Sequence, residues 1–88
     1  MDPLPSPEAF DLGPYRASMA KRLPMLRARA KLSQAELAEA SGVGHRTIKK
    51  IEAGIGNPEL ETLLRLQQVL GVSTLEEFFG ELPSQRPN

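Results

Sequence analysis

Glycine breaks divide this chain into short segments, and each segment has the apolar spacing of a helix. Glycines stand at positions 42, 54 and 71, directly after runs in which apolar residues recur every three or four positions. No stretch alternates apolar and polar residues as a half-buried strand does. The pattern therefore predicts an all-α fold in which five helices surround one core.

The expected helices cover residues 14–31, 34–40, 45–53 and 58–70, and a short last helix carries Leu75, Phe78 and Phe79. Pro24 lies inside the first helix, where it removes one backbone hydrogen bond and is expected to bend or split the helix. The side chains expected to face the core are Met19, Leu23, Leu26, Ala30, Leu37, Ala38, Val43, Ile48, Ile51, Leu60, Leu63, Leu64, Leu70 and Val72.

Polar residues at the segment starts have the positions of helix caps. Ser33 and Glu36 have the spacing of a capping box, in which each side chain binds the backbone N–H of the other residue. Asn57 is expected to cap the fourth helix, with Pro58 at its first position. The cap expected for the last helix is Ser73 or Thr74.

Length and composition exclude several classes of site. The chain has 88 residues and no cysteine, so it forms one small domain without disulfides or thiolate metal ligands. His45 is its only histidine, and its only aspartates, Asp2 and Asp11, lie near the N-terminus. No catalytic triad around His45 is expected, and neither enzyme activity, a metal nor a cofactor is expected.

The two ends of the chain differ in composition from the middle. Residues 1–14 contain four of the eight prolines and are expected to form a flexible arm, and residues 83–88 a disordered tail. The folded domain is therefore expected over residues 15–82. The chain shows neither a signal peptide nor an apolar run long enough for a membrane span, so we expect a cytoplasmic protein.

The formal net charge is zero, but the charges are segregated along the chain. Residues 21–50 hold eight basic and two acidic residues, whereas residues 51–88 hold two basic and six acidic residues. Screening limits charge interactions to about 8 Å at physiological salt, so a partner responds to the local charge. The basic middle favours an anionic partner, although each charged run is also compatible with an ordinary solvated helix face.

Residues 34–53 have the pattern of two short helices that meet at a corner. Ala38 is small enough for the helices to cross there, and Gly42 supplies the turn. The apolar anchors on either side are Leu37, Val43 and Ile48. These offsets indicate a helix-turn-helix, and the alternative is a plain pair of helices in an all-α bundle.

The stretch from Leu23 to Phe79 resembles the helix-turn-helix domain of the lambda repressor, Cro and Xre family. The segments that carry the resemblance are LSQAELAEASGV, TIKKIEAG and NPELETLLRLQQVLGV. The resemblance implies a compact five-helix, lambda-repressor-like DNA-binding domain, dimeric in most members, whose third helix lies in the major groove.

The resemblance and the residue chemistry together indicate a DNA-binding site. The residues expected to contact bases are His45, Arg46, Thr47, Lys49 and Lys50. Arg46 is the first candidate because arginine can bridge both acceptors of a guanine edge, whereas Thr47 would touch a thymine methyl or a phosphate. The residues expected to contact phosphates are Ser33, Gln34, Gly44 and Asn57. Gly44 stands where the family has serine or threonine, so only its backbone amide can make that contact.

The resemblance predicts an ion pair, and the apolar C-terminal end predicts a partner surface. Arg27 and Glu52 match a family pair that ties the first helix to the third, and we assign them a structural role. The expected dimer or partner surface consists of Leu75, Phe78, Phe79 and Leu82. Closure of the core is the alternative role for Phe78 and Phe79. Because adjacent helical residues cannot face the same point, this alternative still leaves one of the two for a partner.

The sequence therefore predicts a sequence-specific regulator of transcription that binds double-stranded DNA. Its simplest form is a repressor that binds a palindromic operator as a homodimer. An antitoxin that also binds a toxin and represses its own operon is one alternative, and a protein-only interaction module is another.

Overall fold

The computed structural model describes residues 10–80, and this part of the chain is helical without any strand. The five helices are α1 (Gly13–Ala30), α2 (Gln34–Ser41), α3 (His45–Glu52), α4 (Leu60–Leu70) and α5 (Glu76–Phe79). The predicted all-α, five-helix architecture is confirmed. The expected tail over residues 83–88 lies outside the described residues, as does most of the expected arm.

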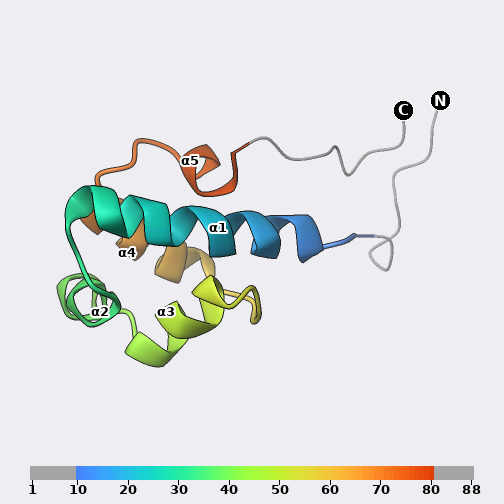
Figure 1. Ribbon diagram of the computed structural model, residues 1–88. Coiled ribbons are helices and arrows are strands. Elements are labelled where there is room, and N and C mark those ends of the chain that lie inside the picture. The colour runs from blue at the N-terminus through green and yellow to red at the C-terminus, as the bar shows by residue number, and fades with distance from the viewer. Residues whose placement is uncertain (1–9, 81–88) are drawn as a thin grey trace.

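Helix α1 is the longest helix and organises the others. It packs against α3, α4 and α5, while α2 packs against α3 and α4. Figure 1 shows the α2–α3 pair on one side of α1 and the short α5 on the opposite side. The helix-turn-helix unit and the C-terminal helix are therefore separated by α1.

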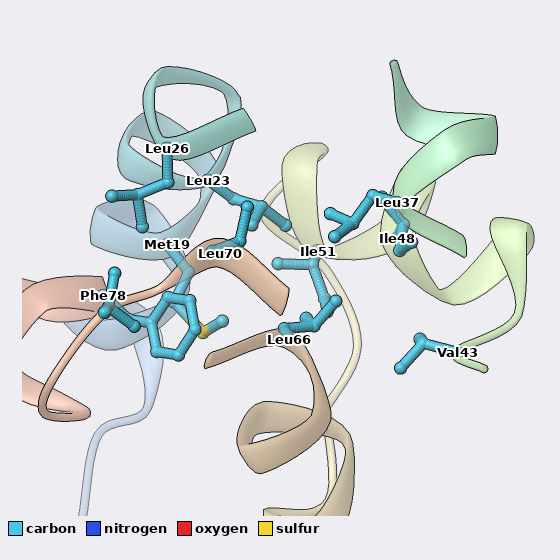
Figure 2. Close-up of a cluster of buried hydrophobic side chains, with 11 residues drawn as sticks. Met19, Leu23, Leu26, Leu37, Val43, Ile48, Ile51, Leu66, Leu70 and Phe78 are labelled. Atoms are coloured by element: carbon cyan, nitrogen blue, oxygen red, sulfur yellow. The ribbon is translucent and has the colours of Figure 1, made fainter. Parts of the chain in front are cut away.

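All five helices contribute side chains to one apolar core, shown in Figure 2. Leu23, Leu37 and Ile48 are completely buried, as are Leu66 and Phe78. The remaining buried apolar side chains are Met19, Leu26, Val43, Ile51, Leu70 and Val72. Each such side chain contributes about 1.5–3 kcal/mol when it leaves water, so burial in this core is the main force that holds the short helices together.

Helix α1 runs without interruption through Pro24, so the expected split does not occur. Proline removes one backbone hydrogen bond from the helix, but the neighbouring Leu23 and Leu26 are buried and hold both halves against the core. The helix ends at Lys31, which takes a left-handed conformation with φ of 61° and donates its N–H to the Ala28 carbonyl.

The expected start of the fourth helix is wrong. Helix α4 begins at Leu60 rather than Pro58, and Glu59 precedes it in an extended conformation. Asn57 therefore lies outside the helix and does not cap it. Because Glu59 has a ψ of 159°, the backbone turns into the helix only after Glu59.

The expected core face of α4 is also partly wrong. Leu60 and Leu64 are 62% and 47% exposed, while Leu66 is completely buried. Two apolar stripes run along this helix at helical spacing, one through Leu60 and Leu64 and the other through Leu63, Leu66 and Leu70. Only one stripe can face α1 and α2, and packing selects the second.

The expected cap of the last helix is wrong as well. Helix α5 begins after Leu75, and neither Ser73 nor Thr74 caps it with a side chain. Instead the backbone N–H of Ser73 donates to Glu77 Oε1 at 2.7 Å. This contact joins the side chain of a helical residue to the loop that precedes the helix.

Two polar side chains of α1 fasten α5 to the domain. The Ser18 hydroxyl donates to the Phe79 carbonyl, and Arg22 Nε donates to the Glu77 carbonyl. These bonds occupy carbonyl groups that a one-turn helix leaves without partners. The α5 backbone and the buried ring of Phe78 therefore attach this helix to α1.

The two stripes of α4 can be distinguished by matched substitutions. We predict that Leu66→Ala lowers the free energy of unfolding by about 2–5 kcal/mol because it opens a cavity in the core. Leu64→Ala should change it by about 0.5 kcal/mol or less because the side chain is exposed. Urea denaturation at low protein concentration measures both. Equal losses for the two variants would contradict the observed orientation of α4.

Candidate nucleic-acid interface

Helix α2 begins with the capping box that the sequence predicted. Ser33 Oγ accepts the backbone N–H of Glu36 at 3.0 Å, and Glu36 Oε1 accepts the backbone N–H of Ser33 at 2.9 Å. Hydrogen bonding of the Glu36 carboxylate by Ser33, first by its backbone N–H and then by its side chain, lowers the pKa of Glu36 below its ordinary value. The start of α2 is thereby held in one geometry, with its first N–H groups directed outward.

The turn between α2 and α3 requires glycine at position 42. Gly42 has a φ of 75°, a left-handed conformation, and a Cβ there would lie 3.0 Å from a guanidinium nitrogen of Arg65. Arg65 also donates to the Ser41 carbonyl at 3.3 Å and pairs with Glu61 at 2.8 Å. Arg65 thus ties α4 to the turn, a role that the sequence analysis missed because its partner Ser41 is distant in sequence.

Ser41 also has a structural role that was not expected from the sequence. Its side chain is buried, donates to the Leu37 carbonyl at 2.6 Å and accepts the backbone N–H of Val43 at 3.1 Å. The hydroxyl joins the last turn of α2 to the first residue after the corner. Serine before a turn glycine is the sequence signal that indicates this role.

Helix α3 presents a basic face opposite its buried face. Ile48 and Ile51 are buried, and at 3.6 residues per turn Arg46, Lys49 and Lys50 lie on the other side of the helix. The side chains of Arg46, Lys49 and Lys50 are exposed. The structure therefore gathers three cations on one accessible helix face.

The remaining candidate base contacts flank this basic face. His45 is exposed at the first position of α3, and Thr47 is half-buried on the flank of the helix. Gly44 precedes α3 with a φ of −58° and a ψ of 139° and provides no side-chain cap. Its exposed backbone amide is therefore the only group that Gly44 can offer, as expected from the sequence.

Arg27 and Glu52 form a bidentate ion pair between α1 and α3. Arg27 Nε lies 2.6 Å from Glu52 Oε2, and the second bond, from Arg27 Nη2 to Glu52 Oε1, is 2.9 Å long. Arg27 also donates to the Leu32 carbonyl at 3.0 Å. The hydrogen bond from Arg27 to Glu52 raises the pKa of Arg27.

Glu52 also binds helix α2, through the side chain of Gln34. Gln34 Nε2 donates to Glu52 Oε1 at 2.9 Å, and the Glu52 side chain is only 9% exposed. Burial raises the pKa of Glu52, but the hydrogen bonds from Arg27 and Gln34 outweigh it and hold this pKa below the ordinary value. One carboxylate therefore joins α1, α2 and α3.

The loop between α3 and α4 carries the last candidate phosphate contact. Asn57 is exposed there, beside a hollow of about 190 Å³ whose lining includes Thr47 and Lys50. Arg16 of α1 donates from Nε to the Gly56 carbonyl at 2.7 Å and so holds the loop against the domain. The structure brings Asn57 near the basic face of α3.

The expected C-terminal partner surface is wrong for Phe78. This side chain is completely buried because it closes the core against α1, so no partner can reach it. Leu75 and Phe79 are half-buried, with the Phe79 ring edge-on to Tyr15 at 5.4 Å between centroids. Leu82 lies outside the described residues.

Residues 10–80 contain neither a group of metal-binding side chains nor a helix that is both long and apolar enough to cross a membrane. The capped α2, the glycine turn and the amphipathic α3 instead define a helix-turn-helix domain. A model of the helix-turn-helix family matches residues 25–76, which is more than half of the chain. The chain therefore belongs to the Cro/C1-type helix-turn-helix family, as its sequence resemblance predicted.

The curated relatives are regulators of transcription. The chain is 44% identical over 61 residues to the HTH-type transcriptional regulator PuuR of Escherichia coli (strain K12), covering 69% of this chain and 32% of PuuR. It is 43% identical over 56 residues to an uncharacterised HTH-type transcriptional regulator of Haemophilus influenzae, covering 64% of this chain and 57% of that protein. The chain thus matches about a third of PuuR. No solved structure gives a significant match.

The environment of Glu52 predicts a pH dependence of stability. A carboxylate with a lowered pKa stabilises the fold above the pKa of unfolded glutamate, about 4.3, and this contribution is lost as the pH falls through the folded pKa. We predict that Glu52→Gln unfolds more easily than the native protein at pH 7. The difference should shrink on acidification below about pH 4. Thermal melts across this range measure it, and a constant difference would contradict the role of the ionised carboxylate.

Proposed function

We propose that this protein is a sequence-specific DNA-binding regulator of transcription that inserts α3 into the major groove. The observation that carries the proposal is the exposed basic face of α3, formed by Arg46, Lys49 and Lys50 opposite the buried Ile48 and Ile51. An α-helix fits the major groove, where base edges are distinguishable. The membership of the helix-turn-helix family supports the same function.

The chemistry of each side chain indicates its role on DNA. Arg46 is the first candidate for a bidentate contact with guanine, and Lys50 and His45 follow. Lys49 lies toward the edge of the basic face and suits either a base or a phosphate. Thr47 suits a thymine methyl or a phosphate.

The N-terminus of α2 suits a phosphate beside this groove. The first N–H groups of a helix have no partner within the helix and attract anions. Gln34 adds a side-chain amide at this point, and Ser33 holds the helix start in place through its capping bond. The exposed Gly44 and Asn57 would contact the neighbouring backbone.

DNA binding can be tested on a duplex that the native protein selects from a random pool. We predict that Arg46→Ala weakens binding to this duplex by about 1–3 kcal/mol and relaxes the preference at one base pair. Gel-shift titration and repeated selection measure these effects. The matched control is Lys21→Ala, which removes one cation from an exposed position of α1.

Three outcomes would contradict the DNA-binding proposal. One is unchanged affinity for Arg46→Ala, and another is an equal loss for Lys21→Ala. The third is an affinity that does not change with salt. If the protein binds DNA, a plot of log affinity against log salt concentration should fall with a slope of about −0.9 per neutralised phosphate. Retained regulation by an Arg46→Ala, Lys50→Ala double variant would favour the protein-only module instead.

We further propose that the protein represses transcription by occupying a palindromic operator as a homodimer. Two recognition helices related by a two-fold axis would sit about 34 Å apart on successive major grooves. The exposed Leu60 and Leu64 of α4 offer more accessible apolar surface than the half-buried Leu75 and Phe79. We therefore assign the dimer contact to α4 rather than to the C-terminal residues.

The dimer contact can be tested by sedimentation. We predict that Leu64→Glu shifts the native dimer to monomer, because a charge would be buried in the contact without a partner. Met25→Glu is the control, since Met25 is 60% exposed but lies on α1. A monomeric native protein, or dissociation by the Met25 variant alone, would contradict the assignment.

A further inference from the structure

The hydrogen bond between Gln34 and Glu52 links a candidate DNA contact to the partly buried ion pair of Arg27 and Glu52. Gln34 is the first residue of α2, and Glu52 is the last residue of α3. The bond from Gln34 Nε2 to Glu52 Oε1 is 2.9 Å long. It therefore connects the phosphate-facing end of one helix to the far end of the helix expected in the groove.

Glu52 determines which group of the Gln34 amide it faces. An ionised carboxylate only accepts hydrogen bonds, so the amide nitrogen rather than the amide oxygen must lie against it. Glu52 is itself held in place by Arg27, which donates to both of its oxygens at 2.6 and 2.9 Å. One amide hydrogen of Gln34 is thus used inside the protein, and the second remains for an outside acceptor.

A phosphate also only accepts hydrogen bonds, so it can use the second amide hydrogen but is repelled by the amide oxygen. Without Glu52, the Gln34 side chain would rotate among several conformations and would present either end of its amide. Holding the side chain in advance avoids the entropy cost of ordering it on binding.

We propose that Glu52 is a positioning residue for the DNA backbone contact of Gln34. This inference rests on the proposed DNA-binding function and assigns Glu52 a role beyond its ion pair with Arg27. The carboxylate does not touch DNA. It orients the Gln34 amide as a hydrogen-bond donor toward a phosphate.

The experiment removes the carboxylate without changing the net charge. The double variant Arg27→Met, Glu52→Met replaces the ion pair by apolar side chains, an exchange that buried ion pairs often tolerate. Gln34→Ala is then measured in this background and in the native background, on the duplex selected by the native protein. Circular dichroism establishes that each variant is folded at the temperature of the titration.

We expect Gln34→Ala to weaken binding about fivefold in the native background and less than about twofold in the background of the double variant. The difference corresponds to the cost of ordering one side chain on binding, which the double variant must meet. Asn57→Ala is the control, because Asn57 is an expected phosphate contact outside this network. Its effect should be equal in both backgrounds. If the double variant does not fold, Glu52→Gln serves as the background, since a glutamine can turn either its oxygen or its nitrogen toward Gln34 and no longer selects the donor end of that amide.

The outcomes separate this inference from the proposed function. Equal effects of Gln34→Ala in both backgrounds, or no effect in the native background, would overturn the positioning role and leave DNA binding intact. A native protein that selects no duplex would instead refute the proposed function. A smaller effect of both Gln34→Ala and Asn57→Ala in the variant background would indicate a general loss of the interface, and it would also overturn the inference.

Discussion

A nearly buried carboxylate must be paired, and this requirement constrains the helix-turn-helix unit. Glu52 is 9% exposed, and an unpaired charge in such a place would destabilise the fold strongly. Its partners come from two other helices, Arg27 from α1 and Gln34 from α2. Helices α1, α2 and α3 therefore meet at one point, and the start of α2 keeps a fixed place relative to α3.

The fixed relation of α2 and α3 suits the proposed binding to DNA. A duplex presents its phosphates and base edges at set distances, so a protein must hold its backbone contact and its base contact in one rigid frame. Gly42 provides the turn, Ser41 and Arg65 hold it, and Ile48 anchors α3 in the core. The basic face is accessible because the opposite face of the same helix is buried.

The fold also separates the charges that cancel in the whole chain. The acidic residues Glu76 and Glu77 belong to α5, which packs on the side of α1 opposite the α2–α3 pair (Figure 1). The cations of α3 thus face solvent away from these acidic side chains. Local charge at the basic face of α3 is positive although the formal net charge of the chain is zero.

The sequence by itself determined the helices and the corner, because caps, turn glycines and apolar spacing act between near neighbours. Ser33, Glu36 and Gly42 have roles that depend on residues within a few positions, and the basic face of α3 follows from helical periodicity alone. Only the tertiary structure decided which of two apolar stripes of α4 is buried, and that Phe78 belongs to the core. It also revealed that Gln34 binds Glu52. These choices depend on contacts between segments distant in sequence, which local patterns do not encode.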